Sequence, residues 1–462
     1  MSLQKITSYT QIRGGIPNVL DFGAKGDGTT DDTAAIQAAI NSLPQYGTLN
    51  FAAGTYVISS TLTIGTNNIT LQGNATIIAK ANVQFEYMLS TASINNLTIK
   101  DLEFDVNQAN RVSGQTVRFA GLSINGNFNT ITNIVVSNTL GYNSVPAAAI
   151  GVIGNNNLIQ GCQVINCGGT SGTNASDGIY TGGNQTIISN CIATNCTDTA
   201  FVLENSNYGL ITGCTAYDCS CGAGISTYTA TTNTGNVING LTVKNWNATN
   251  TGGVSIGVVT PVAGTLYDTI VSNVVMSADV GSGYGTGSAI KIRNAGVGRV
   301  KQITVSNCIV DGASVHGIDC DGDVISVTGC RVKNVTSNCI QFVSGYENYA
   351  SSNYVYGGAY GINIGGTASV ITQNNVCLNQ TSWGIYAFDT SYVSSIMNYV
   401  KNTAVGAISK ASGATLEMVG IEGNNFAINN AVGSATSGSV VNKFVVTDRN
   451  GNSLGYVPIY TI

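Results

Sequence analysis

The chain has 462 residues, of which 43% are hydrophobic but only 9% are charged, against roughly 25% in ordinary globular proteins. Its formal net charge of −5 argues against nucleic acid as a partner, because no basic stripe is present to neutralise phosphates. No apolar run predicts membrane insertion, and the start, MSLQKITSYTQIRGG, lacks the apolar region of a secretory signal. The polar surface must therefore consist mostly of Asn, Thr, Ser and Gly, which suits neutral or sugar-like ligands.

The first predicted elements lie in residues 18–59, where a turn rich in Gly and Asp precedes a short amphipathic helix and a strand-like run. Thr30, Asp31 or Asp32 can cap this helix and complement its dipole. Three apolar residues fall on one helix face: Ile36, Ile40 and Leu43. We expect that face to cover the open end of a sheet, and we interpret Asp27, Asp31 and Asp32 as structural rather than catalytic.

Further along the chain one phrase recurs, a small residue followed by an apolar one. Its copies are Ala149-Ile150, Gly178-Ile179, Ala200-Phe201, Gly224-Ile225, Gly253-Val254, Ala289-Ile290, Gly317-Ile318, Cys339-Ile340, Gly361-Ile362 and Gly384-Ile385. By subtraction, successive copies are 22 to 36 residues apart, and short strands with Gly or Asn turns fill the intervals. Units of this kind cannot bury a face alone and must stack, so the pattern predicts an all-β parallel solenoid.

Most of the twelve cysteines follow the register of the repeat. One set follows the Gly or Asn turn and a second set lies five residues later: Cys162, Cys191, Cys214, Cys308 and Cys330, then Cys167, Cys196 and Cys219. Equivalent residues of consecutive coils stack about 4.8 Å apart, so we predict buried ladders of small side chains. Disulfides between neighbouring coils remain an alternative, whereas the absence of Cys-x-x-Cys pairs and partnering histidines argues against zinc.

The opening segment also resembles a known family. The runs GAKGDG at residues 23–28, DDTAAIQ at 31–37 and GTY at 54–56 are similar to the N-terminal signature of the pectate-lyase-like superfamily, in the branch of rhamnogalacturonases, uronate epimerases and phage tailspikes. With the repeats, this resemblance covers about residues 18–430. It implies a single-stranded right-handed parallel β-helix with a short N-terminal capping helix. The tailspike members imply a homotrimer in a phage virion tail or an extracellular setting.

Four segments follow from this interpretation. Residues 1–17 form an N-terminal segment, 18–80 the cap and first coils, 81–430 the β-helix, and 431–462 a C-terminal cap or strand segment. In the last segment, the turn-like residues 448–451 separate two apolar runs, which predicts a hairpin.

Alternation along each strand predicts which side chains point outward. The expected outward row is Tyr180, Val202, Glu204, Ser226, Tyr228, Ser255, Lys291, Arg293, Asp319, Asp321, Gln341, Asn363, Tyr386 and Phe388. Aromatic rings interleaved with charged groups suit a polysaccharide, because sugar faces stack on rings while hydroxyls and uronates take hydrogen bonds and charge.

The predicted catalytic residues are Asp177, Asp198, Glu204, Lys291 and Arg293. The three acids lie on adjacent coils, and glycoside hydrolysis needs a pair of carboxyl groups. The motifs around them resemble those of polygalacturonases, which implies that the aspartates act as acid and base and that Lys291 and Arg293 bind a uronate. Two positions depart from that family, where a second Asp is replaced by Thr199 and a His by Ala223.

The predicted substrate-binding residues are Tyr180, Tyr228, His316, Asp319 and Asp321; no metal and no cofactor are expected. His316, Asp319 and Asp321 form a second cluster that could serve a lyase or epimerase, in which a base removes the proton next to a uronate.

The predicted function is polysaccharide degradation, by hydrolysis or elimination, on an acidic or bacterial surface polysaccharide. The alternative is a non-catalytic rod that binds a carbohydrate or receptor, since this fold supports both. In that case Asp177 and Asp198 are turn residues, and Lys291 and Arg293 form a surface salt-bridge ladder with Asp319 and Asp321.

Overall fold

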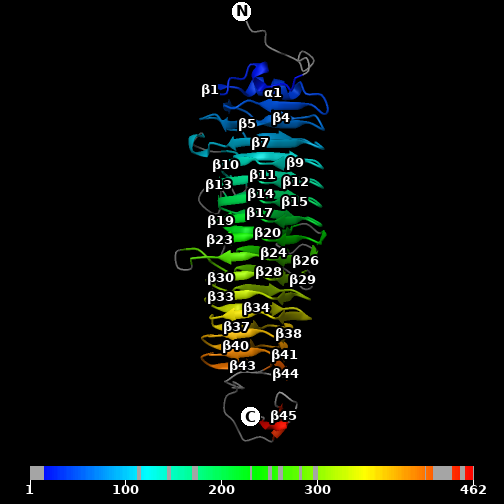
Figure 1. Cartoon of the computed structure of the whole chain (residues 1–462), viewed down its shortest axis with the longest axis vertical. Coiled ribbons are helices and arrows are strands. Elements are labelled where there is room, and N and C mark those ends of the chain that lie inside the picture. The colour runs from blue at the N-terminus through cyan, green and yellow to red at the C-terminus, as the bar shows by residue number, and fades with distance from the viewer. Residues whose placement is uncertain are drawn as a thin grey trace, which may run out of the picture.

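The computed structural model describes residues 15–111, 116–142, 147–168, 175–228, 231–247, 252–258, 264–279, 283–294, 300–411, 413–419, 440–447 and 453–460. These residues form a long rod in which short strands stack in parallel from one end to the other (Figure 1). Each coil contributes three strands, one to each of three columns, and the chain is a right-handed parallel β-helix, as the sequence predicts.

The first column is a 14-stranded parallel sheet among the described residues. Its strands are β4 (Leu62–Ile64), β6 (Tyr87–Thr91), β8 (Ala120–Asn125), β11 (Ala147–Ile153), β14 (Ser176–Gly182), β17 (Thr199–Glu204), β20 (Cys221–Thr227), β24 (Val254–Val258), β28 (Ile290–Asn294), β31 (Ile318–Asp321), β34 (Asn338–Ser344), β37 (Tyr360–Ile364), β40 (Trp383–Ala387) and β43 (Gly406–Lys410). We call the solvent side of this sheet the outer face.

The other two columns are joined by two long strands, β5 (Thr70–Ala79) and β7 (Thr98–Asp105), which run through both. The second column holds β2 (Thr48–Phe51), β9 (Thr130–Thr132), β12 (Leu158–Gln160), β15 (Ile187–Ser189), β18 (Leu210–Thr212), β22 (Val237–Asn239), β26 (Thr269–Ser272), β29 (Ile303–Ser306), β32 (Ser326–Thr328), β35 (Asn348–Ser351), β38 (Ser369–Gln373), β41 (Tyr392–Ile396) and β44 (Thr415–Val419). The third column holds β1 (Asp27–Asp31), β3 (Thr55–Ile58), β10 (Val135–Thr139), β13 (Gln163–Cys167), β16 (Ile192–Cys196), β19 (Thr215–Tyr217), β23 (Thr242–Lys244), β27 (Val275–Ser277), β30 (Ile309–Ala313), β33 (Arg331–Val335), β36 (Tyr354–Tyr356), β39 (Val376–Leu378) and β42 (Tyr399–Lys401).

The recurring small–apolar phrase marks a place where two successive side chains both point into the core. In β14, Gly178 and Ile179 are both buried, and a Cβ on Gly178 would lie 2.5 Å from the Ala200 carbonyl oxygen. Only a small residue fits there. Because strict alternation is broken at this pair, the residues on either side of it, Asp177 and Tyr180, both face outward.

One copy of the phrase was predicted in the wrong register. Phe201 pairs with Ala223 and not with Ile225, so the equivalent pair is Gly222-Ala223. The segment CGAGIS contains two Gly-apolar pairs two residues apart, and only Gly222 packs against Val243 in the core. Ile225 still points inward, because a shift of two residues preserves the face of a strand.

The predicted capping helix is α1 (Thr33–Asn41), which packs near the short helix η2 (Val19–Phe22) and β4 at the N-terminal end of the rod (Figure 1). Its predicted apolar face is buried. The Gln37 amide pairs with both the N–H and the carbonyl of Thr63, over 2.8 and 2.9 Å. The helix therefore occupies backbone groups that the edge strand β4 would otherwise leave open.

Asp32 occupies the N-cap position of α1, but its side chain does not cap the helix. Its two oxygens instead accept hydrogen bonds from the backbone N–H groups of Lys25 and Gly26, over 2.7 and 3.0 Å. Asp27 likewise accepts from Thr29 and Thr30. These aspartates shape the turn, as their structural interpretation predicts, and of the three expected capping residues it is Asp31 that bonds the first turn of the helix, its Oδ1 accepting from the Thr33 N–H over 3.2 Å.

The core contains the predicted cysteine ladders. All twelve cysteines are free and buried, and Cys167 pairs in register with Cys196 on the next coil. Disulfides, the alternative left open by the sequence, are not formed. A third short helix, η3 (Gln108–Asn110), and an extra strand pair from two insertions, β21 (Thr232–Thr234) with β25 (Thr265–Tyr267), lie outside the three columns.

Near the C-terminus, β45 (Val440–Thr447) and β46 (Ser453–Tyr460) pair in antiparallel fashion, so the predicted hairpin is confirmed, although its turn lies outside the described residues. The four predicted segment boundaries remain predictions. Among the described residues, no helix has the length and hydropathy required to cross a bilayer.

Buried asparagines link the turns of the last coils. Asn353, Asn375 and Asn398 are at most 1% exposed. The backbone N–H of Asn353 donates to the Asn375 side chain over 3.0 Å, and that of Asn375 donates to Asn398 over 2.9 Å. Asn375 also donates to the Ala350 carbonyl over 2.7 Å. Each amide thus pairs backbone groups that the strands leave unpaired at a turn.

We predict that Asn375→Ala destabilises the rod by about 3 kcal/mol, because it leaves several buried backbone groups without partners. The expected result is a lower urea midpoint with an unchanged circular dichroism spectrum in buffer. Gln160→Ala, which removes an exposed amide on β12, is the control and should leave the midpoint unchanged. Equal midpoints for the two variants would contradict a stabilising role for the ladder.

Candidate functional site

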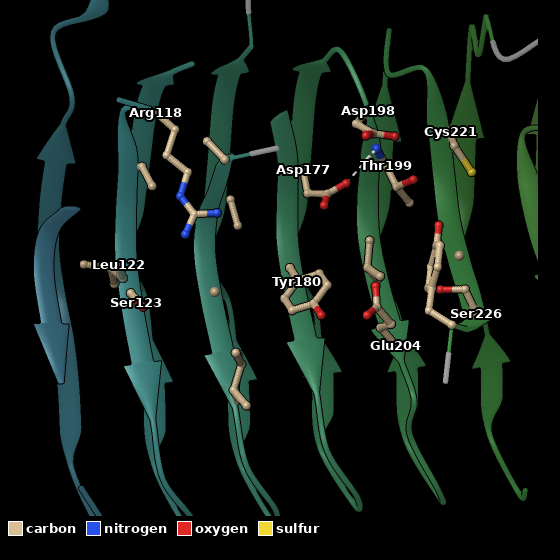
Figure 2. Close-up of a pocket in the computed structure, with 18 of the residues that line it drawn as sticks. Arg118, Leu122, Ser123, Asp177, Tyr180, Asp198, Thr199, Glu204, Cys221 and Ser226 are labelled. Carbon is tan, nitrogen blue, oxygen red and sulfur yellow. Dashed lines mark hydrogen bonds between the residues drawn. The ribbon is translucent and has the colours of Figure 1, made fainter. Parts of the chain in front are cut away.

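A cleft of about 650 Å³ lies on the outer face, spanning β6 to β28. Figure 2 shows most of its lining residues, with Asp177 on β14 near Asp198 and Thr199, and Glu204 nearer to Tyr180. Its lining residues are Tyr87, Arg118, Ala120, Leu122, Ser123, Ala147, Ala148, Gly151, Ile153, Asp177, Tyr180, Asp198, Thr199, Val202, Glu204, Cys221, Gly224, Ser226, Tyr228, Ser255 and Arg293.

Small residues on the neighbouring strands create the hollow. In register with Tyr180 stand Gly151 on one side and Val202, then Gly224, on the other. Because parallel coils repeat about every 4.8 Å, a glycine or alanine in this row leaves a gap as deep as the missing side chain. The acids therefore lie at the bottom of a depression rather than on a flat face.

Asp177 and Asp198 form the acidic centre of the cleft. The backbone N–H of Thr199 donates to Asp177 Oδ1 over 3.1 Å, which ties the two strands together at this point (Figure 2). Burial, the Asp198 carboxylate and Glu204 together raise the pKa of Asp177 well above its usual value, against the opposing effect of the Thr199 hydrogen bond. Burial also raises the pKa of Asp198. Two neighbouring carboxyls of this kind hold a shared proton more readily than isolated ones do.

Glu204 is the third acid, at the far end of β17. Burial raises its pKa, while a hydrogen bond from the Tyr180 hydroxyl partly offsets the shift. The pKa of Tyr180 is raised in turn by burial and by Glu204, so its hydroxyl stays protonated and remains a donor. Burial and Glu204 also raise the pKa of Tyr228. Both tyrosines therefore surround the carboxylate as neutral groups.

Arginines lie at the two ends of the cleft. Arg118 Nε donates to Glu86 over 2.5 Å, and its guanidinium lies 5.2 Å from the centre of the Tyr87 ring and donates to the Tyr87 hydroxyl. Arg293 lines the opposite end, in the row that runs from Glu204 through Ser226 to β28. No ion pair among the described residues involves Asp177, Asp198 or Glu204.

The structure thus brings together six of the predicted site residues: Asp177, Asp198, Glu204, Tyr180, Tyr228 and Arg293. The remaining four, Lys291, His316, Asp319 and Asp321, lie beyond the cleft on β28, β31 and the preceding turn. Their chemistry differs from that of the cleft, because a cation and an acid pair there.

Lys291 Nζ lies 3.9 Å from Asp319 Oδ2, as in the salt-bridge alternative. Burial raises the pKa of Asp319, with Lys291 opposing the shift. Burial and Lys291 lower the pKa of His316 to about 4, so the imidazole is neutral near pH 7. The Ser344 hydroxyl hydrogen-bonds to Asp321. Among the described residues, no group of three or more His, Cys, Asp or Glu side chains is placed to hold a metal ion.

Sequence reasoning missed the residues upstream of the first recognised repeat. Tyr87 begins β6, Glu86 directly precedes it, and Arg118 lies just before β8, where the phrase occurs as Gly121-Leu122 in register with Ala149-Ile150. Extending the repeat one coil towards the N-terminus would have placed Arg118 just ahead of a strand of the outer face. Val202 and Asn363 point outward as predicted but are each only 7% exposed, since neighbouring side chains cover them.

The fold and the cleft define a class: a right-handed parallel β-helix with a carboxylate-lined cleft on one sheet. Residues 16–226 match the family model described as rhamnogalacturonase A/epimerase, pectate lyase-like. That segment contains the capping helix, the opening motifs and the acidic centre of the cleft. The resemblance to the pectate-lyase-like superfamily that the opening segment predicts is therefore confirmed.

Among curated proteins, a stretch of 63 residues is 44% identical to mannuronan C5-epimerase AlgE3 of Azotobacter vinelandii. It covers 13% of this chain and only 3% of that relative's length, so it carries little information about the whole protein.

Two solved structures share the fold along most of the chain. The N-terminal fragment of gene product 12 of bacteriophage Phi29 has a TM-score of 0.60 at 17% identity, and the match covers 91% of this chain and 74% of that one. A mutant of the tailspike protein of E. coli bacteriophage HK620 has a TM-score of 0.57 at 15% identity, and the match covers 87% of this chain and 78% of that one. At this identity the likeness concerns the fold alone.

The raised pKa of Asp177 predicts a pH-dependent effect of Asp177→Asn on stability. A folded-state pKa above the unfolded value, about 3.9, means that the group favours folding only while protonated, and that this contribution is lost as pH rises through the folded-state pKa. We expect Asp177→Asn to raise the Tm by about 2 °C at pH 8 and to leave it unchanged at pH 3. Thermal unfolding of both proteins across this range measures the difference.

Asp311→Asn is the matched control, for which we expect a change in Tm of the opposite sign. Partial burial raises the pKa of Asp311, but hydrogen bonds from Lys333, at 2.8 Å, and Asn334 outweigh it and leave the pKa below its usual value. This variant should lower the Tm at pH 8. A Tm for Asp177→Asn that falls at pH 8 would contradict the assignment of a destabilising carboxylate in the cleft.

Proposed function

We propose that this protein degrades polysaccharide as a glycoside hydrolase and that the cleft holds an acidic or bacterial surface polysaccharide. The observation that carries this proposal is the gathering of Asp177, Asp198 and Glu204 in one depression without a paired cation. On the side of the rod, Asp311 is instead neutralised by Lys333. Carboxyls without a cationic partner and partly desolvated hold their protons to higher pH than exposed ones, which favours acid catalysis.

The roles follow from the relative pKa values. Asp177, whose pKa is raised by burial and by two other acids, is the general acid that protonates the glycosidic oxygen as the bond to the anomeric carbon breaks. Asp198 or Glu204, ionised, then serves as the base that takes a proton from the attacking water, or as the nucleophile. Tyr180 holds Glu204 in place through its hydroxyl, and Tyr228 offers a ring and a hydroxyl beside it.

Arg118 and Arg293 support an acidic sugar as the substrate. They are the cations that line the cleft, one at either end, and a guanidinium binds a carboxylate with two parallel hydrogen bonds. Cleavage by β-elimination is the second candidate, because a carboxylate of raised pKa can also remove the proton next to a uronate while an arginine stabilises the enolate.

A phage tailspike setting, with a homotrimer in the virion, is part of the proposal and is supported by the likeness in fold to the Phi29 and HK620 proteins. The non-catalytic binding rod remains the rival. The cleft favours the enzyme, because a binding surface has no need of three unpaired acids whose burial costs stability.

The test is to incubate the protein with a panel of capsular, exopolysaccharide and plant polysaccharides, following new reducing ends and the ultraviolet absorbance of unsaturated uronates in parallel. We expect reducing ends without absorbance, and a loss of at least about 100-fold in kcat for Asp177→Asn and Asp198→Asn. Reducing ends together with absorbance would establish the lyase instead.

Asp268→Asn is the control for these variants. Asp268 lies in an exposed turn with a positive φ of 48°, a conformation that asparagine also tolerates, so activity should be unchanged. Silence across a panel that includes a polysaccharide the protein demonstrably binds would refute the enzyme and leave the binding rod.

A further inference from the structure

The outer face carries a second distinctive surface, far from the cleft. Four aromatic side chains of β37, β40 and the residue after β40 form it, and we call it the aromatic platform: Tyr360, Trp383, Tyr386 and Phe388. In Figure 1, β37 and β40 lie several coils closer to the C-terminal end than β14 and β17, in the same column. The proposed catalytic residues do not include any of the four.

Tyr386 is the centre of the platform. Its ring centre lies 5.2 Å from that of Tyr360, 6.4 Å from Trp383 and 6.0 Å from Phe388. The interplanar angles are only 27°, 16° and 16°, so the four rings are close to parallel. Tyr360, Tyr386 and Phe388 are each partly exposed, whereas Trp383 is only 8% exposed and lies beside Tyr386 as its support.

Glycines on neighbouring coils make room for two of the rings. A Cβ on Gly365 would collide with the Phe388 ring, and one on Gly406 would collide with the Trp383 ring. The Phe388 and Trp383 rings therefore lie against the backbone of these glycines. This support restricts their movement, and a rigid aromatic surface loses little conformational entropy when a ligand stacks on it.

An unpaired polar group lies next to the platform. Asn363 lies on the coil before that of Tyr386 and is in register with it. Its side chain is 7% exposed, and its Oδ1 has no hydrogen-bond partner among the described residues. Its neighbour in the row, Gln341, is satisfied, because its Oε1 accepts from Asn338 over 2.6 Å. A buried acceptor without a partner costs free energy that a hydroxyl donor would recover.

The same row leads back to the cleft. From Tyr180 it passes through Val202, Gly224, Ser255, Lys291, Asp319, Gln341 and Asn363 to Tyr386, one residue per coil. Eight coil steps of about 4.8 Å separate the two tyrosines by roughly 38 Å. Asp319 Oδ1, midway, is likewise buried and unpaired.

We propose that the aromatic platform is a second glycan-binding site, which takes pyranose units of the same polysaccharide at a distance from the cleft. Sugar rings would stack on Tyr386 and its neighbours, and a sugar hydroxyl would donate to Asn363. The inference rests on the proposed action on polysaccharide and adds a holding site, which keeps a long chain attached to the rod by raising its effective concentration at the cleft.

The test is affinity electrophoresis of the full chain in native gels containing dextran, alginate, polygalacturonate or xanthan, with Asp177→Asn present in every protein to prevent cleavage. We expect at least one polymer to retard the protein, and Tyr386→Ala to raise the apparent Kd about tenfold. Tyr399→Ala removes an exposed tyrosine of the third column and should bind normally. Retardation unchanged by Tyr386→Ala, or no retardation in any gel, would overturn the proposal.

Asn363→Leu separates binding from folding. Because the substitution removes a buried amide oxygen that has no partner, the Tm should not fall, yet retardation should weaken. Reducing-end assays of the unmutated protein on the same polymers distinguish the two proposals. Cleavage with retardation independent of Tyr386 would reject the platform alone, whereas Tyr386-dependent retardation without cleavage would reject the hydrolase alone.

Discussion

The parallel pairing of each strand with its equivalent on the next coil is the constraint on which the rest of this protein depends. It places equivalent residues about 4.8 Å apart in straight rows, so a residue type that recurs once per coil becomes a continuous ladder. Buried cysteines and buried asparagines stack in this way, and each asparagine pairs backbone groups at a turn where the strands cannot. The cleft forms where such a row of side chains is interrupted. In the row of Tyr180, glycines occupy positions at which other coils carry larger side chains.

The acids of the cleft lower the free energy of unfolding, and the rest of the rod compensates for this loss. Burying Asp177, Asp198 and Glu204 without a cation raises their pKa values and opposes folding near neutral pH. The coils on either side are closely packed and carry polar ladders that offset such a penalty. Several acids along the rod are paired with a lysine: Asp31 with Lys80, Asp311 with Lys333 and Asp319 with Lys291. The gathering of three acids without a cationic partner in one cleft is the main physical reason to assign chemistry to them.

Much of the fold was predictable because a solenoid repeats its local sequence pattern. The small–apolar phrase identified most strands of the outer face, and alternation indicated which side chains point outward, including Tyr180, Glu204 and Arg293. The errors occurred where one coil departs from the others. CGAGIS offered two equivalent Gly-apolar pairs and the wrong one was chosen, and the coil of Arg118 was missed because its phrase precedes the first recognised repeat. Asp32 occupies the expected N-cap position, but its side chain binds the turn before the helix, a contact with residues six and seven positions away that helix rules do not include.

The sequence by itself determined the class of this fold, the capping helix, the cysteine ladders and the outward position of most of the candidate residues, because all of these depend on periodicity and short-range contacts. The tertiary structure alone decided which acids share a cleft and which lie beside a cation. Asp177, Asp198 and Glu204 belong to the first group and Asp319 to the second, although the sequence places all four on the outer face or at its edge. The difference lies in the side chains of the neighbouring coils, 20 to 30 residues away in the sequence, since glycine and valine leave the space around Tyr180 open whereas Lys291 lies next to Asp319.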